Sequence, residues 1–190
     1  MPVATGVFTP PTGGGSRDGL LFVGRLNAQK GLHHLLDALA RVPAVRLTIV
    51  GDGTEGSALR ERAARLALAD RLTWLPAMPQ PELAAHYRAA RALVVPSVEE
   101  GLGLVAVEAA LCGTPTIAFD SGGLRDVVED GVTGWLVPAG DASALAAAVD
   151  QATRADIAVM GHAARFAPET VAARYRALYE RALGGRSDHP

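Results

Sequence analysis

Short apolar runs alternate with amphipathic stretches along most of this chain. The runs are rich in Leu, Val and Ile and have the length of buried strands. We expect strands at residues 20–24, 45–51, 72–75, 93–95, 116–119 and 135–137. Between the runs, apolar residues recur at helical spacing, as in the stripe of Leu32, Leu35, Leu36 and Leu39. We expect helices at residues 30–41, 57–69, 81–90, 103–111, 142–153 and 169–183, with a short helix around Val127.

Strands that alternate with helices in this way indicate βαβ units. The pattern predicts an α/β fold, a Rossmann-like parallel sheet with helices on both faces. Residues 1–19 are rich in Pro, Gly and Ser and are expected to form a linker or irregular lead-in. Residues 20–183 are expected to form one domain, and residues 184–190 a frayed tail.

Composition narrows the class of protein. Hydrophobic residues make up 49% and charged residues 20%, as in a soluble globular protein, and the net charge of -2 does not favour nucleic acid as a partner. No apolar stretch predicts a transmembrane segment, because the longest one is interrupted by Glu108, Gly113 and Pro115. The single cysteine, Cys112, and the lack of a signal-like start favour a cytoplasmic protein.

Two glutamates, Glu100 and Glu108, bracket the segment that holds the strongest chemical signal. Glu100 falls in the turn after the expected strand 93–95, and Glu108 falls inside the following helix. The turn Gly101-Leu102-Gly103 has little side-chain bulk, so a ligand can approach its backbone, and the start of a helix attracts an anion. A diphosphate between two carboxylates that bind hydroxyl groups would fit this arrangement.

The distribution of basic residues also indicates an anion-binding site. Of 18 basic residues, 17 are arginines, and the one lysine, Lys30, stands beside Gly31 where a helix is expected to start. An ammonium group is a compact charge on a flexible stem and differs from a planar guanidinium. This position makes Lys30 a candidate for phosphate binding.

Several ordered motifs resemble the C-terminal, donor-binding lobe of GT-B glycosyltransferases of family 4, also called group 1. They cover nearly the whole chain and read GVFTPP, FVGRLNAQKG, VGDGTEG, YRAAR, PSVEEGLGLVAVEAALCGTPTIAFDSGGLRDVVEDGVTGWLVPAGD and RYRALYERAL. The register of the family's glutamate pair fits Glu100 and Glu108, whereas Glu99 would pair with Val107. The resemblance implies one lobe of a GT-B fold.

The resemblance also implies roles for individual residues. Arg25 and Lys30 would neutralise the donor diphosphate, and Glu100 would hold hydroxyls of the transferred sugar. Glu108 would accept hydrogen bonds from the ribose, and Met78 would lie near the base. The backbone of Gly101, Leu102, Gly103, Leu104 and Val105 would complete the phosphate cradle.

In this family, transfer from a nucleoside diphosphate sugar is retaining and needs no metal or other cofactor. The chain starts where the family's N-terminal lobe would end, so we expect the acceptor-binding lobe to be missing from it. Two positions depart from the family pattern: Leu102 replaces an aromatic residue, and Thr54 replaces a common proline.

Three alternatives remain. The stretch Gly51 to Gly56 matches G-x-G-x-x-G, the fingerprint of NAD-dependent oxidoreductases, but no acidic residue ends the next strand. Glu100 and Glu108 could be the two carboxylates of a glycosidase. The chain could also be a nucleotide-sugar-binding module that is catalytically silent without a separate acceptor lobe.

Overall fold

Six parallel strands form one sheet in the computed structural model, which describes residues 3–13, 15–155, 157, 159 and 165–184. The strands are β1 (Leu20–Val23), β2 (Leu47–Val50), β3 (Leu72–Leu75), β4 (Ala92–Val95), β5 (Thr116–Phe119) and β6 (Gly134–Val137). Their order in the sheet is β3-β2-β1-β4-β5-β6. All neighbouring pairs are parallel, which confirms the α/β, Rossmann-like prediction.

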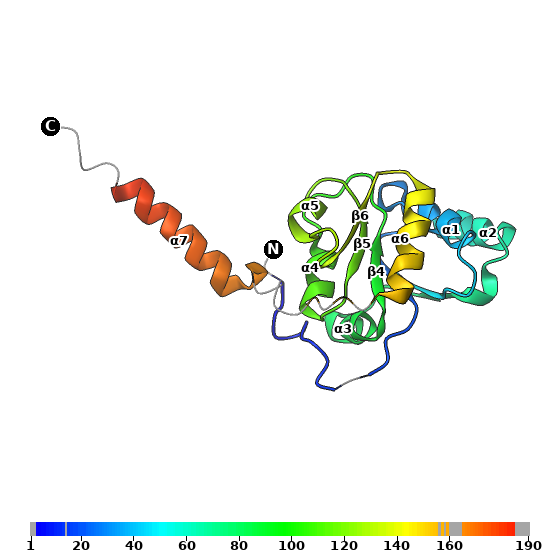
Figure 1. Cartoon of the computed structure of the whole chain (residues 1–190), viewed down its shortest axis with the longest axis horizontal. Coiled ribbons are helices and arrows are strands. Elements are labelled where there is room, and N and C mark those ends of the chain that lie inside the picture. The colour runs from blue at the N-terminus through cyan, green and yellow to red at the C-terminus, as the bar shows by residue number, and fades with distance from the viewer. Residues whose placement is uncertain (1–2, 14, 156, 158, 160–164, 185–190) are drawn as a thin grey trace.

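Helices cover both faces of the sheet (Figure 1). The helices of the described chain are η1 (Ala28–Lys30, 3-10), α1 (Leu32–Leu39), α2 (Gly56–Arg65), η2 (Ala69–Arg71, 3-10), α3 (Gln80–Ala89), α4 (Leu104–Leu111), α5 (Leu124–Val127), α6 (Ala142–Arg154) and α7 (Pro168–Gly184). Buried residues of α1, α2 and α6 form one core cluster with the sheet, and those of α3, α4 and α5 form a second on the opposite face.

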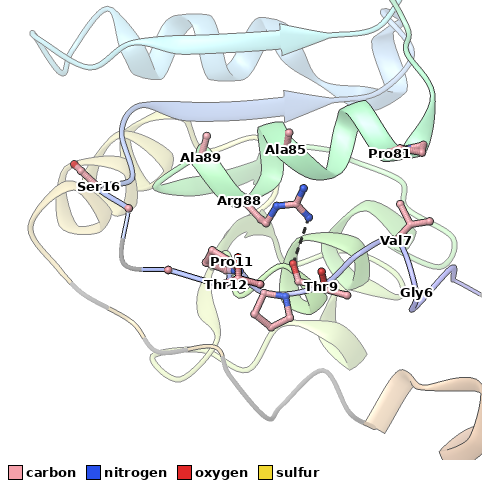
Figure 2. A pocket seen from close by; sticks show the side chains of 13 residues that line it. Gly6, Val7, Thr9, Pro11, Thr12, Ser16, Pro81, Ala85, Arg88 and Ala89 are labelled. Carbon is pink, nitrogen blue, oxygen red and sulfur yellow. Dashed lines mark hydrogen bonds between the residues drawn. The ribbon is translucent and has the colours of Figure 1, made fainter.

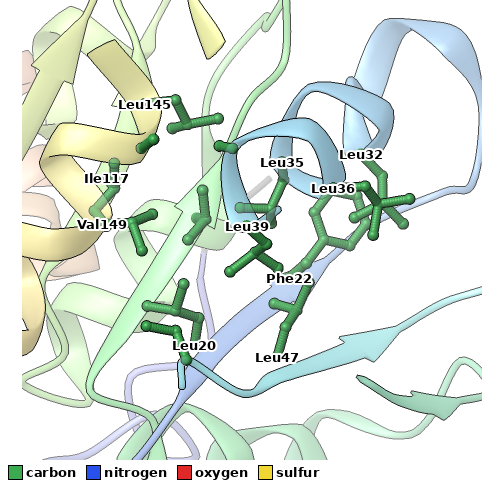
Figure 3. Packing of buried hydrophobic residues seen from close by; sticks show 14 of the residues in the cluster. Leu20, Phe22, Leu32, Leu35, Leu36, Leu39, Leu47, Ile117, Leu145 and Val149 are labelled. Atoms are coloured by element: carbon green, nitrogen blue, oxygen red, sulfur yellow. The ribbon is translucent and has the colours of Figure 1, made fainter. Parts of the chain in front are cut away.

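Strand β1 shows why the apolar runs have no polar alternation. Leu20 and Phe22 pack into the cluster with α1 and α6, to which Leu35, Leu39 and Leu145 also belong (Figure 3). Leu21, between them, belongs to the cluster on the other face. Because both faces of a parallel sheet are covered, every position of such a strand is apolar.

Two helices differ from their expected bounds by more than one residue. The expected helix 30–41 is split, because Gly31 has a left-handed backbone (φ 65°) that separates η1 from α1. Lys30 therefore ends a 3-10 turn and does not start a helix. The expected helix 57–69 ends at Arg65, since Ala67 has φ 54° and Leu68 N–H bonds back to the Ala63 carbonyl. Alanine gives no sequence signal for such an end.

The two ends of the described chain differ in how they pack against the domain. The described residues of the lead-in, 3–13 and 15–19, form neither helix nor strand, yet Phe8 is buried in the second core cluster and the Arg17 guanidinium donates to the Gly113 carbonyl at 2.6 Å. It is therefore packed against the domain. Helix α7 extends away from the body (Figure 1) and exposes Tyr175 and Leu178. Among the described residues, no helix is long and apolar enough to cross a membrane.

Candidate functional site

The strand order reverses direction between β1 and β4, which start the two halves of the sheet. In open parallel sheets, the connections that leave these two strands diverge to opposite faces, and the crevice between them binds ligands. The loops after β1 and β4 carry Arg25, Lys30 and Glu100. The fold therefore places three of the expected site residues at this crevice.

Lys30 and Glu100 meet across the crevice. The Lys30 Nζ lies 2.7 Å from Glu100 Oε2, and their side chains are 30% and 11% exposed. A charge-assisted bond of this length, partly screened from water, holds both groups in place while leaving the ammonium accessible. The fold thus brings together two side chains that lie 70 positions apart in the sequence.

The loop that carries Lys30 has little freedom to move. The Asn27 side chain accepts a hydrogen bond from the Lys30 N–H at 3.2 Å, and Gln29 O accepts one from Val98 N–H at 3.2 Å. A Cβ on Gly31 would lie 1.9 Å from the Pro96 carbonyl oxygen. These contacts tie the loop after β1 to the loop after β4.

The G-x-G-x-x-G stretch supports the same loop from the other side. A Cβ on Gly51 would lie 2.0 Å from Gly24 O, and a Cβ on Gly53 would lie 2.3 Å from Leu26 O. Leu26 N–H also bonds to Asp52 O at 2.9 Å. The glycines therefore have a packing role next to Arg25. They follow β2, not a strand at the reversal point, which argues against a dinucleotide fingerprint.

A third loop, after β5, fixes the turn between the two glutamates. Gly123 N–H bonds to the Glu100 carbonyl at 3.1 Å, and a Cβ on Gly122 would lie 1.8 Å from the same oxygen. Helix α4 then begins at Leu104 with Gly103 as its N-cap and no side-chain cap. The first N–H groups of a helix have no partner inside it, so they are available to an anion.

Glu108 lies in the second turn of α4 and is half-buried. Its Oε2 accepts a hydrogen bond from the Tyr87 hydroxyl at 2.8 Å. Burial raises the pKa of Glu108, and the bond from Tyr87 opposes that shift. Burial and the neighbouring Glu108 raise the pKa of Tyr87 well above its usual value, so its hydroxyl stays protonated and donates.

Two other expected site residues, Arg25 and Met78, make no hydrogen bond or ion pair with Lys30 or Glu100 among the described residues. Arg25 is exposed in the loop after β1, and within the described residues its guanidinium has no hydrogen bond or ion pair. Met78 is half-buried after β3 and packs against the second core cluster, with β2 between its strand and β1. An open guanidinium next to Lys30's loop suits a second cation for an anionic ligand.

The surroundings of Cys112 and of the possible metal ligands do not favour a chemical role. Cys112 is buried, and burial raises the pKa of its thiol to about 11, so it is no nucleophile at neutral pH. In the part of the chain that the structure describes, no three His, Cys, Asp or Glu side chains gather as a metal site would need.

A large hollow of the described molecule lies elsewhere. It has a volume of about 810 Å³ between the lead-in and α3, and Arg88 is its one charged lining residue (Figure 2). None of the expected donor-site residues lines it. A second hollow of about 620 Å³ borders Gly101, Leu102 and Leu104 and continues to the start of α7. The candidate site is thus an open crevice next to this second hollow.

Tyr87 is the site residue to which sequence reasoning assigned no role, although it lay in a stretch that resembles the family. A signal was present: Leu83, Ala84 and Tyr87 share the buried face of α3. A buried tyrosine hydroxyl needs a hydrogen-bond partner. Only the fold could identify that partner as Glu108.

A family model and the curated relatives both identify this chain as similar to glycosyltransferases. The family model described as glycosyl transferases group 1 matches residues 15–168. The D-inositol 3-phosphate glycosyltransferase of Mycobacterium marinum is 38% identical over 178 residues, which covers 86% of this chain and 38% of that protein.

Solved structures agree in fold. Sucrose-phosphate synthase from Thermosynechococcus elongatus superposes with a TM-score of 0.82 at 31% identity, over 97% of this chain and 52% of that one. HepE of Anabaena, solved with UDP and also with UDP-glucose, gives a TM-score of 0.76 at 28% identity over 87% of this chain and 49% of that one. The chain thus spans 38% of the curated relative and about half of each solved chain.

Proposed function

The chain belongs to the group 1 glycosyltransferases, and on this premise we propose that it is the C-terminal, donor-binding lobe of a retaining, family 4 enzyme with a GT-B fold. Its ligand would be a nucleoside diphosphate sugar. The observation that carries the proposal is the Lys30 to Glu100 pair at the reversal point of the sheet, directly before the open N-terminus of α4. A cation, an anion-binding helix end and a hydroxyl-binding carboxylate converge there.

Each part of the donor then has a partner. Lys30 and Arg25 bind the diphosphate together with the backbone of residues 101–105. Glu100 holds hydroxyls of the sugar, Glu108 those of the ribose, and Met78 contacts the base. Glu108 suits the ribose role because its Oε1 is left over after Oε2 has accepted the Tyr87 hydroxyl.

The chemical step places charge on the diphosphate. The bond between the anomeric carbon and the diphosphate oxygen breaks, and its electron pair stays on the leaving oxygen. The acceptor hydroxyl oxygen forms the new bond to the anomeric carbon, and its proton passes to the leaving diphosphate. Lys30, Arg25 and the N–H groups of α4 stabilise that charge. With this set of fixed positive groups, we propose that transfer needs neither a metal ion nor another cofactor.

Nucleotide binding tests the proposal. Calorimetric titration of the folded chain with UDP, GDP and ADP should show one of them binding at a single site. We expect UDP to bind, because HepE, of the same fold, was solved with UDP. The half-site is open, so affinities in the micromolar to millimolar range are expected. A well-folded chain that binds none of the three would overturn the proposal.

The silent-module alternative shares this site and differs in activity. The chain covers 38% of the mycobacterial relative, and we propose that a second, acceptor-binding lobe completes the catalytic cleft. Incubation of this chain alone with UDP-glucose and a panel of acceptors should then give no transfer product. Transfer to any acceptor would reject the silent module, while leaving the donor site as proposed.

Acidification is expected to weaken UDP binding through Glu108. The carboxylate accepts ribose hydroxyls, and burial raises its pKa, so the binding form is lost as the pH falls toward that raised value. At pH 8, Glu108→Gln should bind UDP about tenfold more weakly than wild type. As the pH is lowered from 8, this ratio should shrink, because wild-type Glu108 loses its charge. Comparison with Glu108→Gln at each pH removes the titration of UDP itself, and a ratio that stays constant would contradict the role of Glu108.

A further inference from the structure

Tyr87 is fully buried on α3, and the proposed donor chemistry gives it no part. We propose that Tyr87 is the positioning residue of the nucleotide's ribose: its hydroxyl holds Glu108 in the orientation that accepts the ribose hydroxyls. The proposal rests on the proposed function, because it needs a nucleotide at this site. Its physical basis is the 2.8 Å bond from the Tyr87 hydroxyl to Glu108 Oε2.

Two contacts, one to the backbone and one to the ring, hold Tyr87 in place and thereby position its hydroxyl. The Tyr87 carbonyl accepts a hydrogen bond from Thr114 Oγ1 at 2.6 Å, and Thr114 follows the end of α4. The Tyr87 ring packs edge-on against Phe8 of the lead-in, with ring centroids 5.8 Å apart. Since α4 also carries Glu108, the donor and the acceptor of the key bond are fixed to the same framework.

This bond changes what Glu108 can do. A glutamate side chain has several rotatable bonds, and binding a ligand with a free side chain costs conformational entropy. A tyrosine that stays protonated can only donate to a carboxylate, so it favours the ionised, acceptor form of Glu108. Because Oε2 already accepts the Tyr87 hydroxyl, Oε1 is left to accept the ribose hydroxyls. Tyr87 therefore pre-orients the carboxylate before the nucleotide arrives.

The lead-in also contributes to this arrangement. Arg17 donates to Thr114 Oγ1 at 2.9 Å and to the carbonyls of Cys112 and Gly113, at the end of α4. Phe8 and Arg17 thus contact both helices that meet at the Tyr87 to Glu108 bond. The lead-in stabilises the ribose site without contacting the nucleotide.

Two nucleotides that differ only in the ribose test the proposal. Tyr87→Phe keeps the ring and its packing against Phe8 and removes only the hydroxyl. We expect it to weaken UDP binding about tenfold, as the loss of a hydrogen bond to a charged group does. Binding of 2′,3′-dideoxy-UDP, which lacks the hydroxyls that Glu108 accepts, should change less than about twofold, within the usual effect of a neutral substitution. The matched control, Tyr179→Phe, removes an exposed hydroxyl from α7 and should change neither affinity.

The outcomes separate the two proposals. If Tyr87→Phe weakens both nucleotides equally, Tyr87 has only a structural role and the inference is overturned while the donor site stands. If the wild-type chain binds UDP and 2′,3′-dideoxy-UDP equally, Glu108 does not read the ribose, and both this inference and that part of the proposed function are overturned. Failure to bind UDP at all rejects the proposed function itself.

A second measurement avoids substituting Tyr87. The chain has three tyrosines, so replacement of tyrosine by 3-fluorotyrosine gives three ¹⁹F signals, which Tyr175→Phe and Tyr179→Phe assign. We expect UDP to shift the Tyr87 signal, since the ribose hydroxyls share its acceptor carboxylate. The dideoxy nucleotide should leave that signal in place. Equal shifts with both nucleotides would overturn the inference.

Discussion

Lys30→Ala is expected to weaken UDP binding by about a hundredfold, the largest binding effect of any single substitution in this chain. The substitution removes a charge-assisted bond to the diphosphate. It also leaves Glu100, whose side chain is 11% exposed, without its partner at 2.7 Å. An unpaired carboxylate in that position repels the incoming diphosphate and is costly to keep charged. Calorimetric titration of UDP measures the effect.

A double substitution separates these two contributions. Glu100→Gln in the Lys30→Ala background should recover about tenfold in UDP affinity, because it removes the unpaired charge. UDP lacks the transferred sugar, so the loss of the contact between Glu100 and that sugar does not affect the measurement. The matched control is Arg65→Ala, which removes one positive charge from an exposed position at the end of α2 and should leave UDP affinity unchanged. A Lys30→Ala effect no larger than that of Arg65→Ala would contradict the phosphate role.

Gly31→Ala is expected to lower the stability of the domain by about 3 kcal/mol. Residue 31 has φ 65°, and the added Cβ would lie 1.9 Å from the Pro96 carbonyl oxygen. Alanine therefore strains the backbone and also forces apart the loops after β1 and β4. A loss of this size lowers the midpoint of thermal unfolding by roughly 6 to 12 °C in a domain of this length.

Gly131→Ala is the matched control for that experiment. Gly131 has a similar φ of 73°, but nothing lies within 4 Å of an added Cβ. It should therefore lose only the backbone contribution, about 1 kcal/mol. Equal losses for the two variants would show that the contact between Gly31 and Pro96 does not hold the loops together. Urea unfolding of both variants with the wild type gives the comparison.

Periodicity in the sequence predicted most of the fold. The strand that includes Leu21 and the helix with Leu32, Leu35 and Leu36 were predictable because burial on both faces or on one stripe leaves a clear pattern. The left-handed Ala67 was not, since alanine carries no signal of a helix end. The break at Gly31 was missed because the helical stripe that begins at Leu32 masked it.

The candidate site was predictable in its residue types but not in its contacts. Motif order pointed to Lys30, Glu100 and Glu108, whereas the pairing of Lys30 with Glu100 joins residues 70 positions apart and depends on β1 lying beside β4. The bond between Tyr87 and Glu108 likewise depends on α3 packing beside α4. Such contacts are properties of the tertiary structure, and no local pattern encodes them.

Binding of a diphosphate at the N-terminus of α4 beside Lys30 is the step on which the proposed function depends. The most direct test is titration of the ¹⁵N-labelled chain with UDP, followed by backbone amide NMR. We expect the amides of residues 101–105, together with Lys30 N–H, to shift most. Shifts centred on the hollow between the lead-in and α3, or no shift at these amides with UDP at millimolar concentration, would contradict it.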